Sequence, residues 1–362
     1  MIGFYCATPY HVFVSLHLSV TKYKDKKKNI LILDHFSYAS ELVDNLRDTG
    51  LFENVYLLNC STKTIEDKMK RLMKSYFVDR IVKEFSNCIY AEVLFFALDF
   101  LNYAYIIENG AQATEYAYVE DGVGTYFEDE IYSPSRIAST ILKLRGKMKY
   151  ISKVKTIYVF QPQMMFGNRD EFVIKKIPPV SRNNIEFTEL VTKLWTFKEM
   201  DFHAMYMEQP YNEVIGAEYD TREKQIFEVI EKYFKNDELI VRIHPRSKDK
   251  FADKYKDTNY APYEAILLNY NVEKKIIIST FSTACLTPKM MFNQEPLVIL
   301  TYKLYPSFLK KYEEIDKIDA FINKFKMSYR ENKYVQVPNT IEEFEEILRE
   351  LRGESYDTEL KK

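Results

Sequence analysis

Short apolar runs alternate with helical patterns through the first 120 residues of the chain. The runs lack the apolar–polar alternation of a half-exposed strand, and they cover residues 2–7, 30–33, 55–58, 93–98 and 116–119. The helical patterns cover residues 9–20, 38–46 and 64–85. Strands without alternation that are separated by helices are typically buried on both faces, so this half is predicted to be a parallel α/β sheet.

A second alternating series follows a less regular stretch at residues 150–202. Its predicted strands are residues 205–207, 239–243, 275–278 and 297–300. Its predicted helices are residues 222–234, 263–269, 282–292, 305–325 and 341–351. The pattern therefore predicts two doubly wound α/β halves.

The predicted domains are a Rossmann-like domain at residues 1–200, a second one at residues 201–345 and a frayed tail at residues 346–362. Ligands of such sheets bind outside the carboxyl ends of the strands. With the two halves facing each other, the ligand site is expected in the cleft between them.

Composition narrows the class of protein. Of the 362 residues 46% are hydrophobic, which is too many for a disordered chain and enough for a large core. The 51 Lys and Arg residues nearly balance the 53 Asp and Glu residues, and a net charge of −2 leaves no basic footprint for duplex nucleic acid. No apolar run reaches the ~20 residues of a membrane span. Four cysteines form no disulfide framework and no signal peptide is recognisable, so a cytoplasmic location is expected.

Three residue types depart from the usual frequencies. Glycine is scarce, at 9 residues, and neither a GxGxxG nor a P-loop pattern occurs, so a phosphate would be held by side chains and helix N-termini. Tyrosine and phenylalanine are abundant, at 29 and 25. These aromatic residues could form a carbohydrate-stacking surface, but packing in the core is the favoured interpretation.

Two adjacent carboxylates, Glu120 and Asp121, directly follow the predicted strand at 116–119. Close like charges raise the pKa of one carboxyl group, which suits a general base. Gly122 allows the backbone to turn sharply or to approach a ligand. The alternative interpretation is an ordinary acidic turn before the next helix.

A histidine between two arginines directly follows the predicted strand at 239–243. His244 lies between Arg242 and Arg246 and precedes Pro245. Such a histidine can donate to a phosphate or protonate a leaving group, and the arginines could neutralise the phosphate. The alternative is a surface loop whose proline begins a helix.

Hydroxyl side chains crowd the start of the predicted helix at 282–292. They belong to Ser279, Thr280, Ser282 and Thr283. Together with the free N–H groups and the dipole of the helix, they would form an anion site. The alternative is a plain N-cap, which needs only one hydroxyl.

Two helix starts are weaker candidates. Glu264 could accept hydrogen bonds from two ribose hydroxyls, or it could be a favourable charge in a first helical turn. The segment Thr8-Pro9-Tyr10-His11 ends the first predicted strand and begins the first helix at the same cleft, and its alternative interpretation is a capped start with proline at its first position.

The three main motifs together resemble those of the bacterial sialyltransferases, where they are called the D/E-D/E-G, HP and S/S-T motifs. The opening at residues 5–11 and the pair Gln209-Pro210 look closest to glycosyltransferase family 52, which contains lipooligosaccharide and capsule sialyltransferases. The family 38 polysialyltransferases share the motifs. The resemblance spans residues 1–345 and depends on the order, spacing and strand-end placement of the motifs.

The resemblance implies a GT-B-type fold with two Rossmann-like domains and the active site between them. It implies an inverting transfer of sialic acid from CMP-N-acetylneuraminate to a galactoside hydroxyl of a surface glycan, without a metal or another cofactor. Glu120 is then the base that deprotonates the acceptor, with Asp121 beside it. His244 is the acid or hydrogen-bond donor on the departing CMP phosphate.

The remaining implied contacts hold the donor. Ser282 and Thr283 bind the phosphate, with Ser279 as the other candidate. Glu264 resembles the ribose-binding carboxylate, and Pro245 packs near the cytidine.

Two alternatives stay open. One is another nucleotide-sugar or CDP-polyol transferase of cell-surface polymer synthesis, because His-Pro with Ser/Thr recurs in glycerophosphate transferases that use CDP-glycerol. The other is a non-catalytic binding protein with the same fold. The expected partners are CMP-sialic acid and a glycan ending in galactose, with no nucleic acid. A homodimer and a peripheral contact with the inner face of the cell membrane are compatible with the resemblance.

Overall fold

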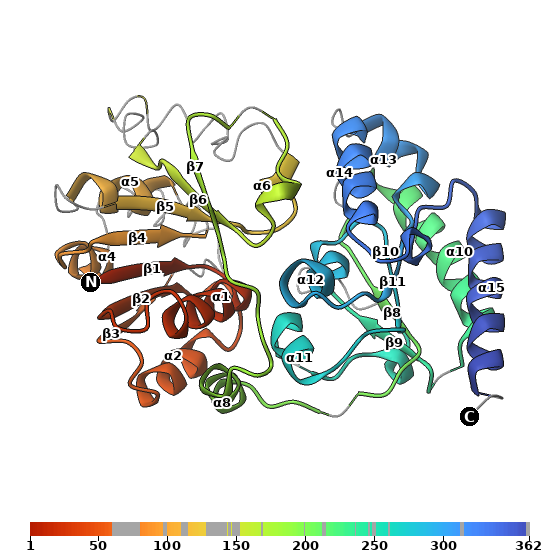
Figure 1. Ribbon diagram of the computed structural model, residues 1–362, viewed down its shortest axis with the longest axis horizontal. Coiled ribbons are helices and arrows are strands. Elements are labelled where there is room, and N and C mark those ends of the chain that lie inside the picture. Colours follow the sequence, from red (N-terminus) through yellow and green to blue (C-terminus); the bar gives the residue numbers. More distant parts are fainter. Residues whose placement is uncertain are drawn as a thin grey trace. The chain divides into compact units, whose positions relative to one another are not determined.

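The computed structural model divides into two compact units, Met1–Thr196 (unit 1) and Phe197–Lys362 (unit 2). The residues that the structure describes are 1–59, 80–96, 100–109, 115–127, 143, 146, 153–167, 169–198, 200–211, 215–235, 237–244, 247, 251–259, 261–311 and 315–359. Each unit has its own parallel sheet (Figure 1).

Within its described residues, unit 1 holds a sheet in the order β3-β2-β1-β4-β5-β6-β7, with every pairing parallel. The strands are β1 (Ile2–Cys6), β2 (Lys28–Leu33), β3 (Asn54–Leu58), β4 (Glu92–Phe95), β5 (Glu115–Val119), β6 (Thr156–Val159) and β7 (Val173–Lys176). The first six follow the strand order of a Rossmann fold, which reverses between β1 and β4. Ligands of this fold bind at the carboxyl ends of the strands beside that reversal.

Six helices of unit 1 are described. They are α1 (Pro9–Val20), α2 (Ala39–Asp48), α4 (Arg80–Ser86), α5 (Phe100–Asn109), α6 (Gly124–Phe127) and α8 (Ile185–Leu194). Helices α1 and α2 both contact α8, and α4 contacts α5 (Figure 1). Helix α1 begins where the sequence predicts, because the Thr8 hydroxyl accepts a hydrogen bond from the His11 N–H at 3.3 Å and Pro9 occupies the first helical turn.

The described strands of unit 2 form a parallel sheet in the order β12-β11-β10-β8-β9. They are β8 (Ala204–Met207), β9 (Leu239–Arg242), β10 (Ile276–Ser279), β11 (Leu297–Leu300) and β12 (Val335–Gln336). Counted within the unit this is the flavodoxin-like order, and its reversal lies between β8 and β10. The carboxyl ends of these two strands are thus the expected ligand position in unit 2.

The described helices of unit 2 are α10 (Ala217–Tyr233), α11 (Tyr263–Asn269), α12 (Thr283–Phe292), α13 (Pro306–Lys311), α14 (Ile315–Met327) and α15 (Ile341–Glu359). Helix α11 contacts α12, and α15 contacts α10. Leu348 of α15 is fully buried, and Arg352 forms an ion pair with Glu238 at 2.5 Å. Helix α15 therefore belongs to the packed unit 2 through part of the stretch for which the sequence predicts a tail.

The structure confirms the predicted α/β class with parallel sheets and differs in several elements. Strands β6, β7 and β12 and helices α5 and α8 are additional to the predicted ones. The helix predicted at 305–325 is described as α13 and α14, and α15 continues past residue 351 to Glu359. Most of the helix predicted at 64–85 lies outside the described residues, which resume at Arg80 in α4.

Aromatic side chains fill the cores. The largest fully buried side chains are those of Tyr5, Tyr126, Tyr158, Tyr206, Tyr219, Tyr302, Tyr305, Phe4, Phe13, Phe85 and Phe95. The single tryptophan, Trp195, follows α8 at the end of unit 1 and is buried as well. For these residues the packing interpretation holds.

Two buried glutamates are each bonded to a pair of tyrosines. In unit 1 the carboxylate of Glu92 accepts hydrogen bonds from Tyr23 at 2.7 Å and Tyr158 at 2.9 Å. In unit 2 the carboxylate of Glu223 accepts from Tyr206 at 2.9 Å and from Tyr219 at 3.4 Å. Tyrosine hydroxyls thus satisfy carboxylates that the cores enclose.

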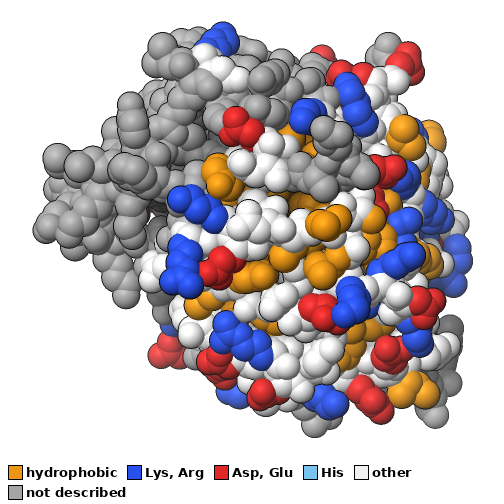
Figure 2. Space-filling model, turned by 90° about the vertical axis from the view of Figure 1, so that its left-hand side faces the viewer, with side chains coloured by type: hydrophobic (Ala, Val, Ile, Leu, Met, Phe, Trp, Pro, Cys, Tyr) orange, Lys and Arg blue, Asp and Glu red, His pale blue; other side chains and the backbone are white. Residues whose placement is uncertain are grey.

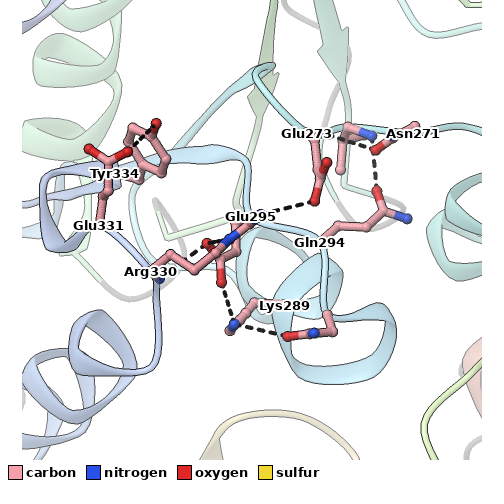
Figure 3. A network of polar contacts seen from close by, with 10 residues as sticks. Asn271, Glu273, Lys289, Gln294, Glu295, Arg330, Glu331 and Tyr334 are labelled. Atoms are coloured by element: carbon pink, nitrogen blue, oxygen red, sulfur yellow. Dashed lines mark hydrogen bonds and ion pairs between the residues drawn. The ribbon is translucent and has the colours of Figure 1, made fainter.

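An ionic group around the buried Glu295 links α12 to the loops that precede β11 and follow α14 (Figure 3). Glu295 accepts hydrogen bonds from Lys289 Nζ at 2.5 Å, from Arg330 Nε at 2.9 Å and from the Arg330 backbone N–H at 3.2 Å. Arg330 also reaches Glu273 at 3.3 Å. Glu295, Lys289 and Arg330 are called the Glu295 network below.

The described surface mixes both signs of charge. On the face in Figure 2, acidic and basic side chains are interspersed with small hydrophobic areas. This agrees with the near-zero net charge. In the described part of the chain, we find no helix that is both long and apolar enough to cross a membrane.

Candidate active site

Four strand ends of unit 1 meet at one group of side chains. Thr8, Tyr10 and His11 follow β1, Phe96 follows β4, the acidic pair follows β5 and Phe160 follows β6. Strands β1 and β4 are the two at which the sheet order reverses. The acidic motif therefore lies where this fold binds its ligands.

Glu120 is buried, with 4% of its surface exposed. One carboxylate oxygen, Oε2, accepts a hydrogen bond from the Phe160 backbone N–H at 2.9 Å and another from the Tyr126 hydroxyl. The other oxygen, Oε1, accepts from the Tyr10 hydroxyl at 3.4 Å. All three donors are neutral groups.

Burial raises the pKa of Glu120 to about 7, although the hydrogen bonds from Tyr126, the Phe160 backbone and Tyr10 act in the opposite direction. Desolvation disfavours the charged form, and neutral donors compensate only part of this effect. A carboxyl group with a pKa near neutral pH is suited to accept a proton from a substrate hydroxyl.

Asp121 differs from its neighbour in exposure and partner. Its side chain is 43% exposed, and its Oδ1 lies 2.5 Å from Nε2 of the fully buried His11. Gly122 follows with a φ of +129°, a backbone conformation that favours glycine. The turn leads into α6, which carries Tyr126 back to Glu120.

The start of α1 is more than a capped helix. Thr8 caps the helix and Pro9 occupies its first turn, as the alternative interpretation predicts. The same turn also directs Tyr10 to Glu120 and His11 to Asp121. Tyr10 and His11 belong to the segment that the sequence places at this strand end, but no role in the site was predicted for either residue.

In unit 2 the hydroxyl motif lies beside the reversal of the strand order. Gln209, just after β8, donates from Nε2 to the Ser282 hydroxyl at 3.0 Å. Ser282 is the N-cap of α12 and accepts from the Ala284 N–H at 3.3 Å. Thr283 is the first residue of that helix. Ser282 and Thr283 thus stand at a helix N-terminus, where anions are favoured.

The hydroxyl groups of Ser279 and Thr280 form hydrogen bonds inside unit 2. The Ser279 hydroxyl donates to the Met207 carbonyl at 2.7 Å and is fully buried. Thr280 lies 3.1 Å from the Tyr219 hydroxyl and 3.4 Å from that of Tyr305. These contacts tie β10 to β8 and to the core of unit 2.

His244 follows β9 at the same edge of the sheet. Its backbone N–H donates to Glu208 Oε2 at 3.1 Å, and its carbonyl accepts from the Ser247 N–H at 2.8 Å. Glu208 itself follows β8, so the strand-end loops after β8 and β9 are joined. Pro245 and Arg246 lie outside the described residues.

Arg242 is the last residue of β9, and it is linked to the segment that leads into α11, the helix that carries Glu264. The Arg242 guanidinium pairs with Asp257 and donates to the Ala261 carbonyl at 2.6 Å. Its positive charge is therefore compensated within unit 2. Glu264 is buried in the first turn of α11.

The structure brings the predicted residues together in two groups, one in each unit. Glu120, Asp121 and Gly122 join the Thr8–Pro9 turn in unit 1, and His244 joins the Ser282 helix start through the ends of β8 and β9 in unit 2. Among the described residues, no group of three or more His, Cys, Asp or Glu side chains could hold a metal ion.

Solved structures with a similar fold are distant in sequence. A Methanocaldococcus jannaschii UDP-GlcNAc 2-epimerase, in complex with UDP-GlcNAc and UDP, is 14% identical with a TM-score of 0.53, over 97% of this chain and 92% of that chain. Arabidopsis thaliana UGT89C1 complexed with UDP is 11% identical with a TM-score of 0.47, over 97% and 99%. The similarity to the epimerase confirms the predicted GT-B-type fold.

Family membership comes from the sequence. No curated protein matches the chain. The model of the alpha-2,8-polysialyltransferase family matches residues 4–302, which include the acidic, His-Pro and Ser/Thr motifs. The chain therefore belongs to the alpha-2,8-polysialyltransferase family, a family of sialyltransferases.

Proposed function

We propose that this protein transfers sialic acid from CMP-N-acetylneuraminate to a hydroxyl group of a glycan, with inversion at the transferred sugar. The observation that carries the proposal is Glu120, a buried carboxyl group with a pKa of about 7 at a strand end of unit 1. A general base at this pKa is half-ionised near neutral pH, so it can accept a proton during turnover.

The proposed step is a single displacement. Glu120 takes the proton of the acceptor hydroxyl while that oxygen bonds to the anomeric carbon of sialic acid. The bond from this carbon to the phosphate oxygen of the donor breaks, and CMP leaves with the electron pair. Negative charge that gathers on the phosphate is stabilised by hydrogen-bond donors.

Unit 2 supplies those donors under this proposal. His244 donates to the departing phosphate, and the N-terminus of α12 with Ser282 and Thr283 holds it. Glu264 accepts hydrogen bonds from the ribose, and Pro245 packs near the cytidine, as the resemblance implies. Because side chains and a helix N-terminus stabilise the leaving group, the proposal uses no metal ion.

The acceptor has two candidate classes. A galactoside end of a capsule or lipooligosaccharide glycan follows from the resemblance to the bacterial sialyltransferases. The name of the matching family favours a second candidate, an acceptor that already ends in sialic acid and is extended through an α-2,8 linkage. We place the reaction in the cytoplasm at the inner face of the membrane, where a lipid-linked glycan would be available.

The decisive experiment is a donor-release assay with the purified full chain. CMP-N-acetylneuraminate is supplied with a lactoside, with a sialylated lactoside or with no acceptor, and CMP and product masses are measured. CMP release with at least one acceptor, together with a product heavier by one or more sialic acids, is expected. No CMP with any acceptor, while CDP-glycerol or a UDP-sugar is consumed, would overturn the proposal.

Two serine variants test the donor contacts. We expect S282A to raise the KM for the donor roughly tenfold, since one hydrogen bond to a charged group is lost. S279A is the matched control, because its hydroxyl bonds the Met207 carbonyl inside the sheet. S279A should lower stability and leave that KM unchanged, and the reverse pattern would assign the phosphate to the first pair.

A further inference from the structure

We propose that His11 is a positioning residue that fixes the Asp121 carboxylate beside the base. The inference rests on the proposed function, because it assigns Asp121 a part in that reaction. The observation behind it is a contact between the fully buried imidazole of His11 and the half-exposed carboxylate of Asp121. The two residues lie 110 positions apart in the chain.

The hydrogen-bond pattern assigns the tautomer of His11. The Ala7 backbone N–H donates to Nδ1 at 2.9 Å, so Nδ1 carries a lone pair and no proton. The remaining ring proton is then on Nε2, which lies 2.5 Å from Asp121 Oδ1. His11 is thus a neutral donor with one fixed direction, and Asp121 is its acceptor.

The imidazole is held on several sides. Its ring stacks on Phe96 with 5.0 Å between centroids, and its backbone N–H donates to Thr8. The ring is 0% exposed, and the Asp121 side chain is 43% exposed. An exposed carboxylate on a turn samples several rotamers, so a donor of fixed direction selects one of them.

A fixed Asp121 matters most in the transition state. As the bond to CMP breaks, positive charge develops on the sugar, and a pre-oriented carboxylate stabilises that charge without reorganising. Substrate binding in the ground state involves no such charge. Loss of the positioning contact is therefore expected to lower kcat and to leave the KM for the donor nearly unchanged.

Two substitutions separate the contacts of His11. In H11N the amide stands near the position of Nδ1, so it can still accept from Ala7 but does not reach Asp121. In H11Q the amide nitrogen stands near the position of Nε2 and still donates to Asp121. We expect H11N to lower kcat by roughly 10- to 100-fold and H11Q to recover most of that loss.

The control is a second buried histidine of the same helix. His17 lies on α1 and its Nε2 is 2.8 Å from the Pro178 carbonyl, away from Asp121. H17Q should change stability and leave kcat unchanged. A further test is the double variant H11N/D121N, which should be no slower than D121N alone, because the contact is already lost.

Three results would overturn the inference. They are an H11N variant with wild-type kcat, equal loss of kcat in H11N and H11Q, and additive effects of H11N and D121N. Nitrogen NMR of the imidazole gives a readout without turnover, since Nε2 should be protonated and Nδ1 bare at neutral pH. If the wild type shows this tautomer but releases no CMP with any acceptor, the proposed function fails and the hydrogen-bond assignment stands.

Discussion

Two buried glutamates show how partners decide the charge of a carboxyl group. Glu120 in unit 1 is bonded to two tyrosine hydroxyls and a backbone N–H, and burial raises its pKa to about 7. Glu295 in unit 2 is equally enclosed, but its donors are Lys289 and Arg330 (Figure 3). Burial alone would raise the pKa of Glu295, and the hydrogen bonds from the two cations outweigh it, so the pKa is lowered.

The difference separates a reactive group from a structural one. A carboxylate with two cationic partners stays ionised over the physiological range and has no reason to take a proton. A carboxylate among neutral donors is held near its own titration point. Substitutions in both regions therefore test this comparison.

The largest effect is expected for catalysis. E120Q keeps the size of the side chain and removes the base, so CMP release should fall by roughly 10²- to 10⁴-fold. E92Q is the matched control, since Glu92 is also buried and bonded to two tyrosines but lies at the amino end of β4. Equal activity of E120Q and wild type in a steady-state CMP assay would remove Glu120 from the mechanism.

A rise in pH should change the contributions of Glu120 and Glu295 to the unfolding free energy in opposite directions. The pKa of Glu120 is raised from 4.5 to about 7, so wild type should lose unfolding free energy between these pH values, relative to E120Q. At about 1.4 kcal/mol for each pKa unit, this loss is roughly 3 kcal/mol. Glu295 has a lowered pKa, so its contribution is present above pH 4.5 and is lost as the pH falls.

E295Q should therefore destabilise the chain by about 3 kcal/mol at pH 7, because Lys289 is left buried without its carboxylate. The difference from wild type should shrink below pH 4. Urea unfolding followed by circular dichroism at several pH values measures both variants. If both E120Q and E295Q raised the unfolding free energy above pH 7, or both lowered it, the comparison would be contradicted.

A smaller effect is expected from the donors to Glu120. The Tyr126 hydrogen bond lowers the pKa of Glu120, so Y126F should move the acidic limb of the kcat/KM profile to higher pH. At pH values below the pKa of Glu120, kcat/KM of Y126F should be several-fold lower than that of the wild type. Y158F serves as the control, because Tyr158 donates to Glu92. An unmoved limb in Y126F would mean that another group titrates.

The smallest effect is expected at the outer edge of the Glu295 network. Arg330 and Glu273 are exposed, at 72% and 42% of their side chains. Exposed pairs contribute little, so E273Q should change the unfolding free energy by less than about 0.5 kcal/mol. A loss as large as that of E295Q would show that the network acts as one unit.

Local signals explain which elements the sequence predicts well. Helix α1 begins and ends where it was predicted, because a threonine cap and a proline stand at its start. Strand β7 was not predicted, because its residues are mostly polar or exposed and its pairing with β6 is not local. Strand β12 has two residues at a sheet edge and leaves no pattern to find.

The same contrast between local signals and long-range contacts holds for the candidate active site. The strand-end positions of Glu120, His244 and Ser282 follow from apolar runs that end just before them, and the structure has β5, β9 and β10 there. The partners of Glu120 and Asp121 could not be found this way. Tyr10 and His11 meet them across 110 residues, and such contacts depend on the order of strands in the sheet.

The predicted family is more specific than the family that matches the chain. The resemblance favours glycosyltransferase family 52 with the polysialyltransferases as relatives, and the matching family is the latter. Membership in family 52 and the identity of the donor stay predictions.

The position of the single tryptophan allows the unfolding of the two units to be followed separately in one experiment. Trp195 is buried and directly follows α8 at the end of unit 1, and the described tyrosines occur in both units. Indole fluorescence is therefore expected to follow the unfolding of unit 1, whereas tyrosine absorbance follows both units. A chain of two compact units need not unfold in a single transition. Recording both signals during one denaturation would show in which unit each variant acts, without cutting the chain or adding a label.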